Sequence, residues 1–266
     1  MLQTSKLSFC TTCMGRLHHL QETYINNIEL TKHKANFVLL NYNSTDKMNE
    51  WVKKDLKKYI DNKILNYYHT TEPEFFNMAH AKNIAHKLSD GMLVCNLDAD
   101  CILEKGFIKQ TLETHKQRAL SFGKQELSGR ICISKEDFMK LGGYNEEFIG
   151  WGREDRDLRK RARQLLQIKP IRIEFGSNIR HDDDKRVENY SKRDVSLALN
   201  FKADEDITDK ELRGFMEKRS PELLKLWNYN NSIMEKNLKD KKYVANVNQH
   251  WGKATLIHNF ISSIYI

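Results

Sequence analysis

Two aspartates separated by one residue, Asp98 and Asp100, directly follow an apolar run at residues 91–97. Side chains two positions apart on an extended chain point to the same side, so both carboxylates can face one cation or its water shell. Such oxygen ligands suit Mg²⁺ or Mn²⁺, and either ion can bridge a diphosphate. An Asp-x-Asp pair alone is common in loops, but its place after a predicted buried strand indicates a site for a metal and a nucleotide.

A second group of chemically capable residues lies at residues 142–157, in the string GGYNEEFIGWGREDRD. Its glycines let the backbone turn sharply and approach a ligand, and Trp151 offers a flat face on which a sugar ring can stack. Glu154 and Asp155 then begin a basic helix, where carboxylates are electrostatically favoured. Any one of these residues fits an ordinary aromatic turn with helix-capping acids, but together they indicate a turn that binds a ligand.

The third candidate is His181, in the string IRHDDDK at residues 179–185. A neutral imidazole beside carboxylates can ligate a divalent ion. A histidine near acids is more often a solvated or hydrogen-bonded side chain, so both interpretations stay open on the sequence alone.

Strands and helices are predicted to alternate along the first half of the chain. Apolar or β-favouring runs predict the strands, and apolar residues at helical spacing predict the helices. The alternation predicts an α/β fold with a Rossmann-like, mostly parallel central sheet flanked by helices, in which ligands bind beyond the carboxyl ends of the strands. The predicted strands are 7–12, 36–42, 64–68, 91–97, 130–134 and 171–175, and the predicted helices are 17–28, 48–60, 77–88, 107–115, 135–141 and 155–166.

The composition is that of a globular protein without long linkers, with 39% hydrophobic residues and only 3 prolines among 266 residues. The formal charge of +8 arises from 44 basic and 36 acidic residues that are interleaved, which indicates a solvated surface and no nucleic-acid partner. Five cysteines in apolar segments and an amino terminus unlike a signal sequence predict a cytoplasmic protein with reduced thiols.

The string GGYNEEFIGWGREDRDLRKR, residues 142–161, resembles the carboxyl-terminal signature of the β1,4-galactosyltransferase family, which has a GG-aromatic-x-x-x-aromatic-x-GWGxED pattern. Upstream, residues 76–83 (FNMAHAKN) and the strand before Asp98 are similar to the stretch that leads to that family's DxD motif. Downstream, residues 179–185 are similar to its I-R-H-x-x-D-K metal segment. The amino-terminal half is similar to the broader group of inverting nucleotide-sugar transferases with the GT-A fold, as in many bacterial polysaccharide and capsule enzymes.

The resemblance implies a role for each matching residue. Asp155 would be the general base that deprotonates an acceptor hydroxyl, and Glu154 would help to hold the acceptor. Asp100 and His181 would be metal ligands, with Asp98 close to the nucleotide ribose. The residues implied to bind the acceptor sugar are Trp151, Gly152 and Tyr144, and those implied to lie near the nucleotide are Thr11, Thr12, Arg16, Asp46 and Asn83.

Three positions differ from the family pattern. Asn178 replaces a metal-ligating Met three positions before His181, and because Asn offers a harder oxygen donor, metal preference is expected to shift away from strict Mn²⁺. Arg153 replaces a Gly and Arg156 replaces an acid, which leaves the identity of the acceptor open.

The resemblance implies a GT-A catalytic domain at residues 1–190, divided into a nucleotide-sugar half (1–102) and an acceptor and metal half (103–190). A mainly helical extension, residues 191–266, would pack on the same domain. This tail fits either an acceptor platform or contact with the inner face of a membrane for a lipid-linked glycan, or helices that simply cover the sheet. Within it we predict helices at 210–227 and 231–242, a strand at 243–247, and a final strand or helix.

The implied reaction is metal-dependent transfer of a hexose or N-acetylhexosamine from a UDP-sugar to a glycan hydroxyl, with inversion. Galactose or N-acetylgalactosamine is the expected sugar, and Mn²⁺ or Mg²⁺ the expected cofactor. A nucleotidyltransferase is one alternative, because it also places paired aspartates on a metal and a nucleotide. A non-catalytic carbohydrate-binding module is another, but it leaves the Asp98 and Asp100 pair without a purpose.

Overall fold

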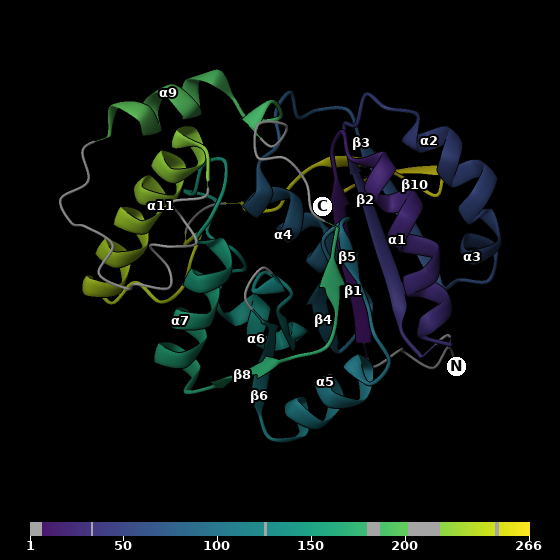
Figure 1. Cartoon of the computed structure of the whole chain (residues 1–266), viewed down its shortest axis with the longest axis horizontal. Helices are drawn as coiled ribbons and strands as arrows, with labels where there is room; N and C mark the ends of the chain where they lie inside the picture. Colours follow the sequence, from purple (N-terminus) through teal and green to yellow (C-terminus); the bar gives the residue numbers. More distant parts are fainter. Residues whose placement is uncertain (1–6, 33, 125–126, 180–186, 202–218, 248–249) are drawn as a thin grey trace.

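The computed structural model describes residues 7–32, 34–124, 127–179, 187–201, 219–247 and 250–266. A nine-stranded sheet forms its centre, and two short strands form a separate sheet (Figure 1). The strands of the large sheet are β1 (Leu7–Cys13), β2 (Asn36–Tyr42), β3 (Leu65–Thr70), β4 (Leu93–Asn96), β6 (Ala119–Gly123), β7 (Cys132–Ser134), β8 (Lys169–Ile173), β10 (Thr255–His258) and β11 (Ser262–Tyr265), and those of the small sheet are β5 (Cys101–Ile102) and β9 (Ser177–Asn178).

The strand order of the large sheet is β11-β10-β3-β2-β1-β4-β7-β6-β8. The block β3-β2-β1-β4 is parallel, as is the pair β6-β8. Antiparallel pairing joins β4 to β7, β7 to β6, and β3 to the β10-β11 hairpin. The predicted α/β class is confirmed, and the parallel block places the carboxyl ends of β1, β2 and β4 at one edge.

Helices cover both faces of the sheet (Figure 1). One face packs against α1, the continuous helix formed by α2, η1 and α3, and α5. The other packs against α4, α6 and α7, and a third group, α9 and α11, lies beside α7. The bounds are α1 Leu17–Leu30, α2 Met48–Trp51, η1 Val52–Leu56, α3 Lys57–Asp61, α4 Met78–Leu88, α5 Phe107–Lys116, α6 Lys135–Lys140, α7 Glu154–Leu166, α9 Lys192–Asn200 and α11 Pro221–Lys239.

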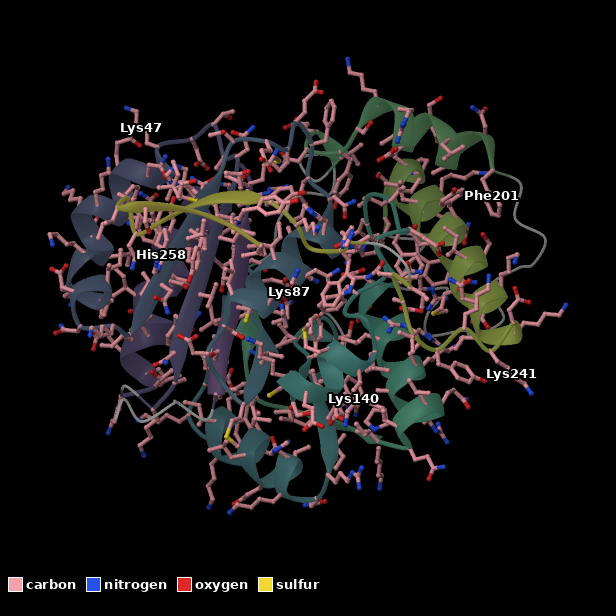
Figure 2. All side chains as sticks on the ribbon, turned by 180° about the vertical axis from the view of Figure 1, so that it is seen from behind. Lys47, Lys87, Lys140, Phe201, Lys241 and His258 are labelled. Atoms are coloured by element: carbon pink, nitrogen blue, oxygen red, sulfur yellow. The ribbon has the colours of Figure 1, made fainter. Side chains whose placement is uncertain are left out.

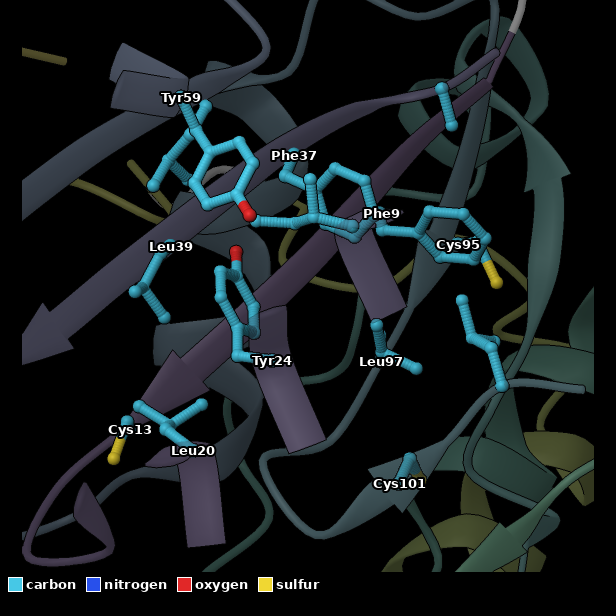
Figure 3. Close-up of a cluster of buried hydrophobic side chains, with 14 of the residues drawn as sticks. Phe9, Cys13, Leu20, Tyr24, Phe37, Leu39, Tyr59, Cys95, Leu97 and Cys101 are labelled. Carbon is cyan, nitrogen blue, oxygen red and sulfur yellow. The ribbon is translucent and has the colours of Figure 1, made fainter. Parts of the chain in front are cut away.

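The alternation of side chains along β1 and β2 divides the core into two layers. Phe9 and Phe37 belong to the layer beneath α1, where their rings stack at 5.2 Å and Tyr24 meets Phe37 edge-on at 5.8 Å (Figure 3). Cys10 and Val38, one position further along each strand, face α4 in the second layer. Both faces of these strands are therefore buried, which explains their continuous apolar runs.

All six predicted strands and all six predicted helices of the first 175 residues are present within a few residues of their expected bounds. β6, which the sequence analysis missed, is a short run that ends at Gly123 and shows no clear alternation. The predicted strand at 243–247 is wrong, because these residues form an irregular segment that bends and ends in a turn. The strands of the tail are β10 and β11, which extend the sheet at its β3 edge.

One helix, α11, spans the described part of the helix predicted at 210–227 and most of the helix predicted at 231–242, while residues 202–218 lie outside the described part of the chain. On the face shown in Figure 2, Lys47, Lys140 and Lys241 lie far apart, in keeping with positive charge that is spread over the surface. No helix in the described ranges has both the length and the apolar character needed to cross a membrane.

Candidate active site

The carboxylates of Asp98 and Asp100 lie just beyond β4, at the edge where the parallel strands end. One oxygen from each and the Cys101 sulfur lie within 4.8 Å of one another. Burial, with both neighbouring carboxylates, raises the pKa of the Cys101 thiol well above its ordinary value, so the thiol stays protonated. The available donors are therefore two carboxylates, and these oxygen ligands fit Mg²⁺ or Mn²⁺.

The small sheet brings a second segment to this carboxylate pair. β9 pairs with β5, and the backbone N–H of Ile179 donates to the Asp100 carbonyl at 2.9 Å. Asn178 lies in β9 and is half-buried. His181 lies outside the described residues, so its role as a metal ligand stays a prediction.

The amino-terminal candidates lie at the carboxyl ends of β1 and β2. Thr11 and Thr12 are buried in β1, and Arg16 is half-buried at the start of α1. Asp46 accepts the backbone N–H of Leu17 at 3.0 Å, which ties the turn after β2 to the start of α1. Its other oxygen is buried without a hydrogen-bond partner in the described part of the chain, so it remains available to a donor group of a ligand.

Asn83 and Tyr144 lie beneath the turn rather than at its surface. The Asn83 side chain accepts the Tyr144 backbone N–H at 2.8 Å and donates to the Tyr144 carbonyl at 2.9 Å and to Glu146 Oε1 at 2.8 Å. Both residues are fully buried. Asn83 therefore anchors the turn to α4, and its amide is already occupied by protein groups.

Lys82, one residue earlier in α4, joins the two groups of carboxylates. Its ammonium lies 3.0 Å from Glu154 Oε1 and 3.8 Å from Asp98 Oδ1, and the residue is 2% exposed. Burial favours neutral lysine, but the charges of Asp98 and Glu154 outweigh it and raise the pKa of Lys82 well above its usual value. Burial raises the pKa of Glu154, and the Lys82 ammonium opposes that change.

Sequence reasoning assigned Lys82 no role. The only signal was a lysine between Ala79 and Ala85 on the apolar side of a predicted helix. A charge in such a place needs a partner, because a lone buried ammonium is strongly unfavourable.

Asp155 begins α7 beside Glu154 and keeps a side chain that is 14% exposed. Burial favours its protonated form, but Arg159, whose Nη2 lies 3.5 Å from Asp155 Oδ2, together with Lys82 and Ser128, lowers the pKa of Asp155 below its usual value. Asp155 is thus an anion at neutral pH. The loop that carries Ser128 also brings Gly129 close, where a Cβ would lie 3.9 Å from Lys82 Nζ. This loop carries no motif and was missed.

Trp151 is half-buried and packs against a cluster formed by α9 and α11. The Arg219 guanidinium lies 5.8 Å from the centre of its ring. Gly152 has a φ of +98°, and a Cβ there would lie 2.9 Å from Trp227 Cδ1. The structure therefore brings Trp151 and Gly152 to the same turn as Asp155, with Gly152 required by the close approach of α11.

Two protein-family models match the chain. The model described as glycosyl transferase family 2 covers residues 8–129, and the model described as the N-terminal domain of galactosyltransferase covers residues 113–181. The first range includes the Asp98 and Asp100 pair, and the second includes Asp155. A search of curated proteins finds no match.

Solved structures share the fold at low sequence identity. S. aureus TarS 1–349 in complex with UDP-GlcNAc is 11% identical with a TM-score of 0.56, over 91% of this chain and 74% of that one. GalNAc-T7 with UDP, GalNAc and Mn²⁺ is 15% identical with a TM-score of 0.57, over 91% and 60%. The mannosyltransferase PcManGT from Pyrobaculum calidifontis, with GDP-Man and Mn²⁺, is 14% identical with a TM-score of 0.55, over 90% and 72%.

These matches separate the open alternatives. Both family models describe sugar transferases, and neither a nucleotidyltransferase nor a non-catalytic binding module is among them. With the strand order and the carboxylates at the edge of the parallel block, they identify the chain as a glycosyltransferase with the GT-A fold.

Proposed function

We propose that the protein transfers a hexose or N-acetylhexosamine from a UDP-sugar to a hydroxyl of a glycan acceptor, with inversion at the anomeric carbon. Galactose and N-acetylgalactosamine are the favoured sugars, because the turn at residues 142–157 resembles the β1,4-galactosyltransferase signature. The observation that carries the proposal is that Lys82 pairs with both Asp98 and Glu154. This pairing joins the carboxylates beyond β4, here called the nucleotide edge, to those of residues 142–157, here called the sugar-binding turn.

Asp100 and His181 are the residues proposed to hold Mn²⁺ or Mg²⁺, and Asp98, whose carboxylate lies close to that of Asp100, is proposed to lie beside the nucleotide ribose. When bound, such an ion neutralises the charge that develops on the departing nucleoside diphosphate. Asn178 would present an oxygen donor near the same segment, which favours a site that accepts both ions.

Asp155 is proposed to act as the general base. As the acceptor oxygen attacks the anomeric carbon, its proton passes to the Asp155 carboxylate, and the electron pair of the broken bond leaves with UDP. The lowered pKa of Asp155 keeps this carboxylate ionised at neutral pH. One base is enough for a single displacement, so an α-linked donor gives a β-glycoside.

Glu154 and Trp151 are proposed to orient the acceptor. Glu154 is held in place by Lys82, and Trp151 lies on the same turn with a face that can stack on a sugar. We further propose a cytoplasmic enzyme whose carboxyl-terminal region could contact the membrane surface when its acceptor is lipid-linked.

Calorimetric titration tests the donor assignment directly. UDP and a panel of UDP-sugars are titrated into the protein with Mn²⁺, with Mg²⁺ and with EDTA. We expect UDP binding only with a metal, and the UDP-sugar that also supports transfer identifies the donor. NMR of the product then reports the anomeric configuration. Absence of metal-dependent binding for every uridine nucleotide would overturn the proposal.

A further inference from the structure

The side chain of Asn230, in the middle of α11, forms hydrogen bonds only with main-chain atoms of the sugar-binding turn. Its Oδ1 accepts the backbone N–H of Ile149 at 3.0 Å. Its Nδ2 donates to the carbonyls of Ile149 at 2.9 Å, Gly152 at 2.9 Å and Trp151 at 3.3 Å. Asn230 is 1% exposed, and the turn residues that it bonds are half-buried. Because Nδ2 has two hydrogens for three carbonyls, one hydrogen is shared, and the side chain thus bonds four main-chain groups of the turn.

The turn at residues 149–153 also rests on the surface of α11. Gly150 has a φ of +55°, and a Cβ there would lie 2.8 Å from the methyl carbons of Leu226. Arg153 has a φ of +78°, and its guanidinium carbon lies 3.5 Å from the centre of the Trp227 ring. The helix therefore sets both the path of the turn and the space available to it.

The far end of the turn is continuous with the catalytic helix. The Arg153 carbonyl accepts the Asp157 backbone N–H at 2.8 Å, in the first turn of α7. Arg161 then fixes α7 by donating to Asp157 Oδ2 at 2.7 Å and to the carbonyls of Leu141 at 2.7 Å and Gly143 at 2.8 Å. Since α7 is fixed in this way, the part of the segment that still needs support is residues 149–153. Among the described side chains, Asn230 makes the most hydrogen bonds to it.

We propose that Asn230 is a positioning residue of the acceptor site. It holds the turn so that Trp151 and Asp155 both face the same bound acceptor sugar. This inference rests on the proposed function and assigns a role in that reaction to the tail helix α11. Asn230 does not contact the carboxylates of the nucleotide edge in any bond described for the chain, so its effect is confined to the acceptor side.

The test compares Asn230→Ala and Asn230→Ser with Asn237→Ala. Asn237 lies two turns further along α11 and donates to Glu147 at 3.2 Å in an exposed position, so it controls for changes to the same helix. We measure KM for the acceptor, KM for the donor sugar, and the affinity for UDP with Mn²⁺. We expect the acceptor KM to rise about tenfold in Asn230→Ala and less in Asn230→Ser, with donor constants within about twofold of wild type.

Three results would overturn the proposal: an unchanged acceptor KM, an equal change in donor and acceptor constants, or loss of folding in both Asn230 variants, which would assign the residue a structural role only. The failure of the proposed function has a different signature, because wild-type protein would then show no metal-dependent UDP binding.

Discussion

The two halves of the proposed active site, a donor side and an acceptor side, are built by different means. On the donor side, Asp98 and Asp46 lie in the short segments that follow the parallel strands β4 and β2, so the sheet sets their places. On the acceptor side, the turn has no ladder of its own and is held by asparagine side chains from distant parts of the sequence. These are Asn83 of α4, Asn230 of α11 and Asn246, which donates to the carbonyls of Gly142 and Tyr144 at 2.7 Å each.

This difference predicts how each half responds to the substitution of a side chain. A ladder of main-chain hydrogen bonds survives the loss of any one side chain, whereas a turn held mainly by a few side-chain hydrogen bonds depends on each of them. Substitutions on the donor side should therefore change ligand binding without moving the backbone. Substitutions around the turn should change its shape, and through it the chemistry.

The largest expected effect is that of Asp155→Asn. The amide cannot accept the hydroxyl proton, so we expect kcat to fall by about 10³-fold or more. UDP binding with Mn²⁺, measured by calorimetry, should stay near the wild-type value because Asp155 lies on the acceptor side. Retention of transfer in this variant would remove Asp155 from the role of base.

Asp100→Ala probes the donor side. Loss of a metal-ligating carboxylate should weaken Mn²⁺ and metal-dependent UDP binding by more than about 100-fold, exceeding the loss usual for an outer-shell partner. The unfolding midpoint should stay close to that of the wild type, since the strand ladder is intact. If binding fell no further than in Asp155→Asn, the division into two halves would be incorrect.

Lys82→Met tests the link between the halves. It leaves the buried carboxylate of Glu154 without its counter-charge, and we expect a loss of about 3 kcal/mol in the free energy of unfolding. The double variant Lys82→Met/Glu154→Gln removes the stranded charge and should recover most of that loss in urea denaturation. Equal stability of the single and double variants would show that the Glu154 charge costs no stability when Lys82 is absent.

The smallest effect expected is a pH dependence of the free energy of unfolding, and it originates at His86, beneath the turn. Burial lowers the pKa of His86 to about 3, while its Nδ1 bonds the Lys82 carbonyl and its ring stacks on Phe138. His86 stays neutral in the folded state and takes up a proton on unfolding below its ordinary pKa of 6.5. Stability should therefore be lost as pH falls below that value, by about 2 kcal/mol between pH 7 and pH 5.

Urea denaturation of wild type and His86→Asn at both pH values isolates this contribution. The variant is expected to be less stable at pH 7 but to lose less on acidification. An identical pH dependence in the two proteins would assign it to other groups.

The donor half could be predicted closely from the sequence because its elements are local. β1, β2 and β4 are continuous apolar runs, and the aspartates stand where the last of these runs ends. The C-terminal hairpin could not be predicted, since β10 and β11 are short and owe their place to pairing with β3, almost two hundred positions away.

The helix α11 shows why the acceptor half was harder to predict. Asn230 and Asn231 are weak helix formers, and the sequence alone favoured a break beside them. The break does not occur, because Pro221 and the Ser220 cap start the helix well and the Asn230 amide finds its partners on the turn. A tertiary contact thus overrides local propensity, and such contacts carry no local signature.

The bonding of Asn230 has a consequence for how the sequence of the turn can change. Because Asn230 bonds only main-chain atoms, selection can replace the side chains at Ile149 and Trp151 while the turn keeps its path. Arg153, a non-glycine residue at a positive φ, is supported by stacking on Trp227. Laboratory evolution toward new acceptors should accordingly vary the residues on the turn and leave the amide beneath it untouched.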